Sequence, residues 1–191
     1  MEHSVFAIEL CMRLNPGDDA RARLADLIAL HPSATDPGTK WSMLDECARV
    51  LVRQKDLYVR GCWDFFETDA KALADYDMWC KGMITREGAR TSPSGAGDPY
   101  RAEPRYMTFT IALLLQKGDS GERSLASYCD IPEAALWKRA TFVRILEALK
   151  CVNFAYVKSD VFYLIPGEES WGLTSQDLQH KKFEYLRLVE D

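Results

Sequence analysis

The sequence predicts an α+β fold: a small, mainly antiparallel sheet of three to four strands whose one face is covered by helices. Three observations lead to this prediction. Residues 105–116 alternate apolar side chains at period two, as a central strand does. Residues 4–14 show a similar alternation. Segments of helical period separate the strands, which are too few for a doubly wound sheet.

The first half of the chain predicts a strand followed by two helices. The strand at 4–14 ends at a turn, and Asp18 or Asp19 can then cap a helix. His31-Pro32 ends that helix, because the residue before a proline disfavours helical geometry. A second helix is expected from Thr39 onward.

The next segment is ambiguous at its start. Residues 58–66 are rich in aromatic side chains and fit either a short strand or the beginning of a helix. A helix is expected from about Thr68 to Glu87. Its predicted buried stripe consists of Leu73, Tyr76, Cys80 and Met83.

Residues 88–104 differ in composition from the rest of the chain. They are rich in Gly, Pro and Ser and nearly free of aliphatic side chains, which predicts a flexible loop. A surface insertion is favoured over a functional loop, and the absence of a G-K-[ST] sequence excludes a phosphate-binding P-loop. Residues 1–191 are therefore expected to form a single α+β domain with one long loop.

The second half begins with the strand at 105–116, for which a buried helix is the alternative because ALLLQKG alone would suit one. A short helix at 124–129 follows. Pro132 suits the first position of a longer helix. That helix is expected to bury Leu136, Ala140, Val143, Leu146 and Leu149.

The C-terminal part predicts a β segment and a last helix. Residues 154–165 form either one strand or a hairpin that turns at 158–160. Thr174 and Asp177 have the spacing of a capping box. The expected final helix carries Leu178, Lys182, Tyr185, Leu186 and Val189 on one face.

Composition excludes several classes of protein. The 191 residues are 47% hydrophobic and 28% charged, an ordinary globular composition. The net charge of -5 opposes non-specific nucleic-acid binding. No apolar window is long enough for a membrane span, and the N-terminus lacks the features of a secretory signal. A cytoplasmic location is expected, or a stromal one in a phototroph.

Motifs of catalytic chemistry are absent from the sequence. The six cysteines are dispersed without a C-x-x-C pair, which favours reduced thiols over a metal site or disulfides. His3, His31 and His180 have no ligand-like spacing and are expected to be solvated. The acidic pairs at 18–19 and 168–169 are adjacent in sequence, which does not suit a two-carboxylate mechanism. We therefore predict no catalytic residue, no metal and no cofactor.

Two features are candidates for contact with a partner. Arg86, Arg90, Arg101 and Arg105 flank the long loop together with Tyr100, and such a cluster could hold an anion or an acidic partner. A rim of scattered, solvated charges is the simpler interpretation. Trp171 lies in a polar turn, where it either anchors a partner or folds back over the sheet edge.

Three segments together resemble a known family. They are VFAIELCMRL with the helical region after it, RYMTFTIALLLQKG, and DVFYLIPGEESWGLTSQDL with YLRLV. This order resembles an uncharacterised family of cyanobacteria and plastids whose plant members are described as fluctuating-light acclimation proteins. The resemblance spans roughly residues 4–189, without the membrane helix that usually precedes the domain in that family. It implies no catalytic residues.

The favoured functional interpretation is a non-catalytic protein-interaction or regulatory module that contacts another protein, and a homo-oligomer stays open. The alternative is a winged-helix, transcription-associated DNA-binding protein that uses residues 106–166. In that arrangement 108–116 is a helix, 133–149 is the recognition helix and 154–165 is the wing. A thiol-based enzyme is a third hypothesis, which needs one cysteine of lowered pKa.

Overall fold

The computed structural model of the chain describes residues 2–15, 17–82, 103–167 and 171–191. Within these residues the chain forms one antiparallel sheet of five strands, in the order β4-β3-β1-β2-β5. The strands are β1 (His3–Arg13), β2 (Tyr58–Phe66), β3 (Tyr106–Gln116), β4 (Val157–Ile165) and β5 (Arg187–Leu188). The α+β class is confirmed, but the predicted number of three to four strands is too low.

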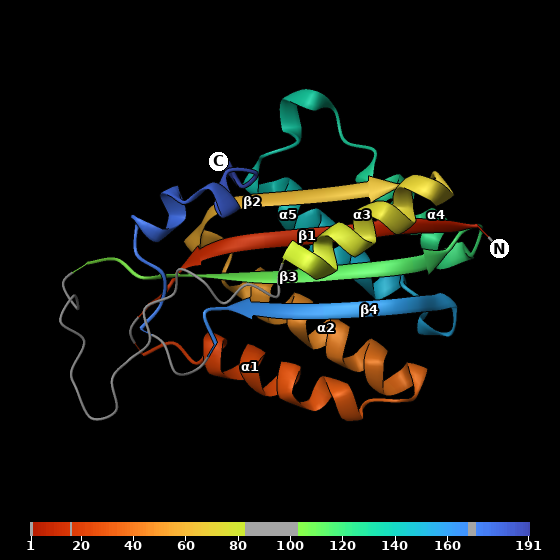
Figure 1. The fold of residues 1–191 in the computed structure, drawn as a ribbon, viewed down its shortest axis with the longest axis horizontal. Helices are drawn as coiled ribbons and strands as arrows, with labels where there is room; N and C mark the ends of the chain where they lie inside the picture. Colours follow the sequence, from red (N-terminus) through yellow and green to blue (C-terminus); the bar gives the residue numbers. More distant parts are fainter. Residues whose placement is uncertain (1, 16, 83–102, 168–170) are drawn as a thin grey trace.

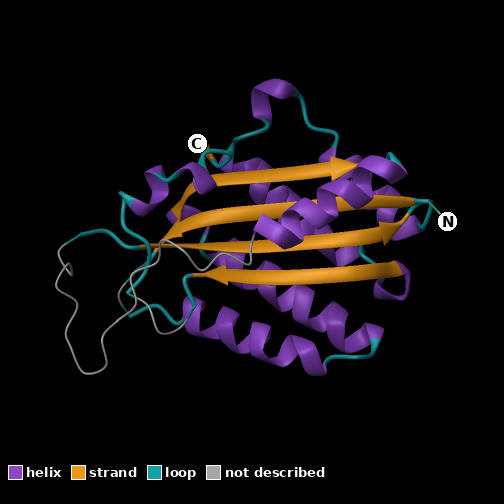
Figure 2. Cartoon of the chain, in the orientation of Figure 1, coloured by secondary structure: helices purple, strands orange, loops and turns teal. Residues whose placement is uncertain are grey.

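Helices cover both faces of the sheet (Figure 1). They are α1 (Ala20–Leu30), α2 (Pro37–Arg53), α3 (Asp69–Gly82), α4 (Ser120–Cys129) and α5 (Arg139–Ala148). Helix α3 lies across β1 and β3 on one face, and the other four helices lie on the opposite face (Figure 2). The prediction that helices cover one face is therefore wrong. None of the described helices is long and apolar enough to cross a membrane.

The two faces of the central strands bury different side chains because successive residues of a strand point to opposite sides. Phe6, Ile8 and Leu10 of β1 meet α1, α2, α4 and α5 in the larger core. Ala7 and Cys11 point the other way, into a smaller core that includes Trp79 of α3 and Phe183 near the C-terminus. Both faces of β1 are therefore buried.

The two strands predicted from alternation are confirmed. Strand β3 pairs with β1 on one side and with β4 on the other, so residues 106–116 are extended rather than helical. The ambiguous segment 58–66 is the strand β2. A helix at 108–116 with a wing at 154–165 is therefore not what the chain forms. Residues 157–165 are one strand of the main sheet, preceded by a 3-10 turn, and not a hairpin.

The starts of the first two helices follow local capping chemistry. Asp18 accepts a hydrogen bond from the backbone N–H of Ala20 at 2.6 Å. Asp36 caps α2 by accepting from the N–H of Thr39 at 2.8 Å. Such caps satisfy N–H groups that have no partner within the helix.

Two predicted helical stripes are only partly right. In α3, Leu73 is 43% exposed, and Ala72 and Trp79 are buried instead. In the region after Pro132, Leu146 and Leu149 are buried as predicted, but Ala140 is exposed, and Phe142 and Ile145 are buried as well. Apolar residues lie on more than one side of each segment, so tertiary packing decides which side is buried.

The helix predicted from Pro132 begins seven residues later, at Arg139. Residues 133–135 form a 3-10 turn, and Lys138 is extended and forms a bridge with Glu190 of the C-terminal tail. Glu190 donates its N–H to the carbonyl of Trp137 at 2.9 Å and accepts from Arg139 N–H at 2.7 Å. These bonds between distant segments replace the helical ones.

The predicted final helix does not form. The reciprocal bonds of the capping box are present, since Asp177 Oδ2 accepts from the N–H of Thr174 at 2.7 Å and Thr174 Oγ1 accepts from the N–H of Asp177 at 3.1 Å. They begin only a 3-10 turn, Asp177–Gln179. A second 3-10 turn and strand β5 follow, because the tail pairs with β2 instead of continuing as a helix.

Candidate functional site

Strand β2 is an open edge of the sheet for half its length. Strand β5 pairs only with Arg60 and Gly61, and beside that pair the N–H of Val189 donates to the carbonyl of Val59 at 3.1 Å. The N–H and C=O groups of a strand point to alternate sides from residue to residue. The outward groups beyond Gly61 therefore belong to Trp63 and Phe65, and no backbone partner for them lies in the described part of the chain.

A groove of about 590 Å³ runs beside this open edge. Its far wall is the segment between α4 and α5, which arches beyond β2 at the top of the view (Figure 1). The indole N–H of Trp63 donates to the carbonyl of Leu136 at 3.0 Å and so ties the arch to the strand. The apolar lining includes Trp63, Phe65, Leu136 and Trp137.

Carboxylates also line the groove. Asp64, Glu67 and Asp130 contribute to its walls. The pKa of Asp64 is raised to about 6, mainly by burial and also by repulsion from Asp75, while Lys71 opposes the shift. Asp75 Oδ2 is buried without a hydrogen-bond donor among the described residues. The groove thus carries an excess of negative charge near β2.

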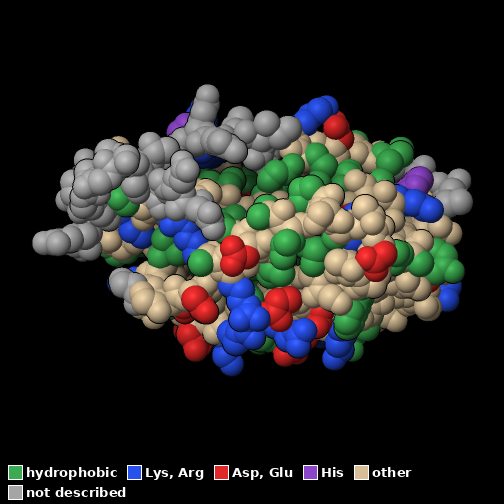
Figure 3. Space-filling view, turned by 90° about the horizontal axis from the view of Figure 1, so that it is seen from below, with side chains coloured by type: hydrophobic (Ala, Val, Ile, Leu, Met, Phe, Trp, Pro, Cys, Tyr) green, Lys and Arg blue, Asp and Glu red, His purple; other side chains and the backbone are tan. Residues whose placement is uncertain are grey.

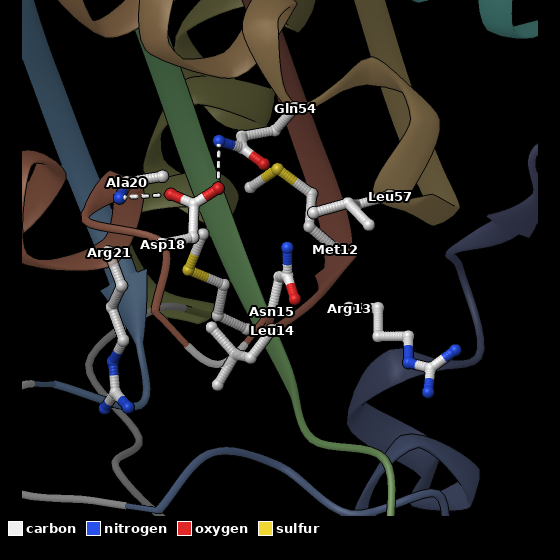
Figure 4. A pocket seen from close by; sticks show the side chains of 10 residues that line it. Met12, Arg13, Leu14, Asn15, Asp18, Ala20, Arg21, Gln54 and Leu57 are labelled. Carbon is white, nitrogen blue, oxygen red and sulfur yellow. Dashed lines mark hydrogen bonds between the residues drawn. The ribbon is translucent and has the colours of Figure 1, made fainter.

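A second hollow, at the start of α1, is too small for a substrate (Figure 4). Its volume is about 20 Å³, which is room for one water molecule. Asp18 points between Ala20 and Gln54, accepting from the Gln54 side-chain amide at 2.8 Å, while Arg13 and Arg21 extend away on opposite sides. The hollow is part of the cap of α1 rather than a binding site.

Glu9 is a carboxyl group in the middle of the sheet and is 1% exposed. Tyr185 donates its hydroxyl to Oε2 at 2.6 Å, whereas Oε1 is buried without a hydrogen bond. Burial raises the pKa of Glu9, and the Tyr185 hydroxyl and the neighbouring Thr108 and Thr110 hydroxyls oppose that shift. The hydroxyls of both threonines form no hydrogen bond of normal geometry. The group is sealed in the smaller core and faces no open cavity among those described.

His31 is not the solvated residue that its sequence context predicts. Its Nε2 contacts Asp160 of β4, whose side chain is 5% exposed, and Lys40 of α2 binds the other carboxylate oxygen. The imidazole ring also lies edge-on to Phe162, with 5.0 Å between ring centroids. These contacts tether α2 and the end of α1 to the β4 edge, and they join residues more than a hundred positions apart.

The cysteines carry reduced, mostly buried thiols. All six are free, and Cys11, Cys47 and Cys62 are buried. Burial raises the pKa of Cys47, Cys62 and Cys129 to about 12. A reactive cysteine needs the opposite shift, so these thiols do not favour a thiol-based enzyme. No group of three or more potential metal ligands occurs in the described ranges.

Most of the predicted contact residues lie outside the described residues: Arg86, Arg90, Tyr100 and Arg101. Arg105 is described and is only 8% exposed, with Glu103 at 3.6 Å, so it does not belong to an exposed rim. Trp171 is half-buried and does not line the groove beside β2. The sequence pattern did not predict the groove, because its walls come from two segments about sixty residues apart. The aromatic run at 63–66 is its one signal in the sequence.

Comparison of the chain with models of protein families, with curated proteins and with solved structures finds no match. The resemblance to the family of cyanobacteria and plastids stays a prediction.

Proposed function

We propose that this protein is a non-catalytic protein-interaction module, and that the groove beside β2 is its contact surface. The observation that carries the proposal is the open strand edge next to a groove lined by Trp63, Phe65 and Trp137. Aromatic side chains are enriched among residues that dominate protein–protein binding. A regulatory role would then be exerted through the partner.

The shape of the groove favours a macromolecular partner over a small molecule. Binding pockets for small molecules enclose most of the ligand surface. This groove is open, and one of its sides is a strand edge whose backbone groups can pair with another chain. Its acidic lining favours a partner with basic side chains at the contact.

The charge distribution supports a protein partner over nucleic acid. Seen from the side of α1, Lys and Arg side chains are interspersed with Asp and Glu in the lower part of the view (Figure 3). Arg23 pairs with Glu46 across α1 and α2, and Arg49 pairs with Asp45 at 2.5 Å. A nucleic-acid interface needs a basic patch instead.

The DNA-binding alternative has less support, because the segment 133–149 assigned to its recognition helix is an α-helix only at Arg139–Ala148. Phe142 and Ile145 of α5 are buried against the sheet. Arg139, a basic residue in the segment assigned to the recognition helix, is bound to Asp191 at 2.6 Å. We therefore place the alternative second, and DNA retention at physiological ionic strength would restore it.

A photo-cross-linking amino acid tests the proposed surface. The full chain carrying p-benzoylphenylalanine at Phe65 or at Trp137 is irradiated in its native cells. We expect a discrete adduct from both positions. The matched control replaces Leu73, an apolar residue that is 43% exposed on α3, and it is expected to yield none.

A second step separates specific contact from chance proximity. The protein identified in the adduct is purified and its affinity is measured for the wild-type chain and for Trp137→Ala. Loss of about tenfold in affinity is expected, as for an aromatic residue at the centre of an interface. Equal adducts at Leu73, or unchanged affinity for Trp137→Ala, would show that the groove is not the contact surface.

A further inference from the structure

We infer that the groove binds an extended peptide segment of its partner as an added strand beside β2, and that this segment alternates apolar and basic side chains. The inference rests on the proposed function, because it names the kind of segment that the contact surface takes. Three features of the groove define that segment: its backbone groups, its apolar wall and its carboxylates.

The backbone of β2 defines the conformation of the ligand. Trp63 and Phe65 each present an outward N–H and C=O where β5 no longer covers the strand. An extended peptide can pair with all four groups, as in other complexes in which a peptide extends a sheet. A helical ligand would satisfy its own backbone groups and leave these four unpaired.

The side chains of β2 define which residues the ligand places on the sheet face that carries the larger core. Trp63 lies opposite Ile8, and Phe65 lies opposite Phe6, so both point to the face of the larger core. Leu136 and Trp137 of the arch flank the groove on the same side. An added strand would therefore place apolar side chains here, where they remove aromatic surface from water.

The sheet face covered by α3 favours positively charged side chains in the ligand. Asp64 lies opposite Ala7, a residue of the smaller core, and so points to the face covered by α3. Asp75 of α3 lies close enough to repel the Asp64 carboxylate, and its Oδ2 has no donor in the described part of the chain. Lys71 is the nearby cation, with its Nζ 3.5 Å from the ring centre of Phe66. A lysine or arginine of the ligand would supply donors to the Asp64 carboxylate, which lines the groove.

These two faces together give the ligand a period of two. Successive side chains of an added strand point to opposite faces of the sheet. The apolar side chains thus alternate with the basic ones. A peptide of the same composition in a different order would place some lysines against Trp63 and Phe65.

A second copy of this chain is a poorer occupant. Pairing two β2 edges about a two-fold axis would bring two Asp64 side chains and two acidic grooves together. Like charges across neighbouring strands are destabilising. The net charge of -5 adds to the repulsion between copies.

The test uses a fluorescein-labelled peptide of alternating valine and lysine, and the full chain at physiological ionic strength. One control peptide carries glutamate in place of lysine. A second control peptide has the same composition, but its lysines and its valines are grouped in separate blocks. Fluorescence anisotropy is expected to show saturable binding of the alternating peptide only. Equal binding of the block peptide would mean that charge alone attracts the ligand and would overturn the strand model.

Two pairs of variants test the contacts. Phe65→Pro removes the outward N–H, and Phe65→Ala is its match because it shortens the same side chain but keeps that N–H. We expect about tenfold weaker binding for Phe65→Pro than for Phe65→Ala, as for a lost hydrogen bond in an interface. Asp64→Asn should weaken binding of the lysine peptide, whereas Asp26→Asn, on α1, should not. Circular dichroism confirms the fold of each variant.

The outcomes separate this inference from the proposed function. If Phe65→Pro and Phe65→Ala bind the alternating peptide equally, strand addition is wrong. The cross-linking result at Phe65 and Trp137 can still hold in that case, and the groove would then bind its partner in another conformation. If the control position Leu73 also gives equal adducts, or if Trp137→Ala keeps its affinity for the partner, the proposed function is wrong as well.

Discussion

Glu9 is a buried acid: its burial favours the protonated form, whereas the hydroxyl groups around it favour the charged form. Among the described residues, one carboxylate oxygen accepts no hydrogen bond of normal geometry, and the two threonine hydroxyls beside it form none. A proton on the carboxyl would let it donate to one of these hydroxyls. The strand therefore carries a group whose ionisation opposes folding.

We predict that Glu9→Gln stabilises the protein at pH 7 and not near pH 4.5. The raised pKa means that the folded state binds more protons than the unfolded state above the ordinary value of 4.5. The stability that this proton supplies is complete below that value and is lost as the pH rises through the raised pKa. Glutamine does not ionise, so its advantage should grow with pH, to about 1 kcal/mol at neutrality.

Urea denaturation at a series of pH values measures this difference. The matched control is Glu122→Gln, because Glu122 is also buried but accepts from Ser4 at 2.6 Å and from the N–H of Gly118 at 3.0 Å. We expect that control to lose stability at pH 7. A Glu9→Gln variant that is less stable than wild type at pH 7 would show that the carboxylate is satisfied as an anion.

At the scale of single residues, the sequence predicts local contacts and misses distant ones. The cap at Asp18 follows from residues that are neighbours in the chain. The contacts of Asp160 with His31 and Lys40, and the proximity of Asp64 to Asp75, arise only when strands and helices are assembled. Local propensity carries no information on which remote side chains meet.

Strand β2 permits a direct test of which of its backbone N–H groups are hydrogen-bonded. Asp64 faces β1 with its backbone, and Phe65 faces outward. Proline removes the N–H of the residue it replaces and is tolerated in a sheet mainly where that N–H is not paired. The two neighbouring positions should therefore respond in opposite ways.

We predict that Asp64→Pro lowers the free energy of unfolding by about 2 kcal/mol relative to Asp64→Ala, because it breaks a bond of the β1–β2 ladder and leaves a carbonyl of β1 without its donor. Phe65→Pro should differ from Phe65→Ala by less than about 1 kcal/mol. Urea denaturation of the four variants gives both differences. Equal losses at the two positions would mean that the outward N–H of Phe65 is already paired.

Element type was predictable where the local pattern and the tertiary context agree. Strands β1 and β3 are buried on both faces and carry the alternation or the apolar run that such strands need. The region 132–138 and the C-terminal segment were predicted as helix from good local signals. Pairing of Glu190 with residues 137–139, and of β5 with β2, overrides those signals. A capping box therefore predicts a helical turn but not how far the helix continues.

The whole molecule protects its two sheet edges unequally. Strand β4 has α1 beside it, and its Asp160 is bound by Lys40 and His31. Arg21 of α1 also binds the carbonyl of Pro166, just beyond the strand, at 3.2 Å. Charged side chains and covering helices are known ways to prevent edge-to-edge pairing. Among the described residues, the outer backbone groups of β2 pair only with β5 and Val189, so the far half of β2 is the less protected edge.

The negative charge around the open edge of β2 repels a second copy of the chain. We predict that this repulsion keeps the chain monomeric at pH 7. There the net charge is -5, and the acidic grooves of two copies repel each other. Near pH 5.3, the isoelectric point of the sequence, the net charge vanishes, and Asp64, with a pKa of about 6, is mostly protonated. Wild type should then form dimers through β2, measured by sedimentation velocity, whereas Phe65→Pro should remain monomeric. If wild type dimerises equally at pH 7, repulsion does not control the edge; if Phe65→Pro also dimerises near pH 5.3, the copies associate through a different surface.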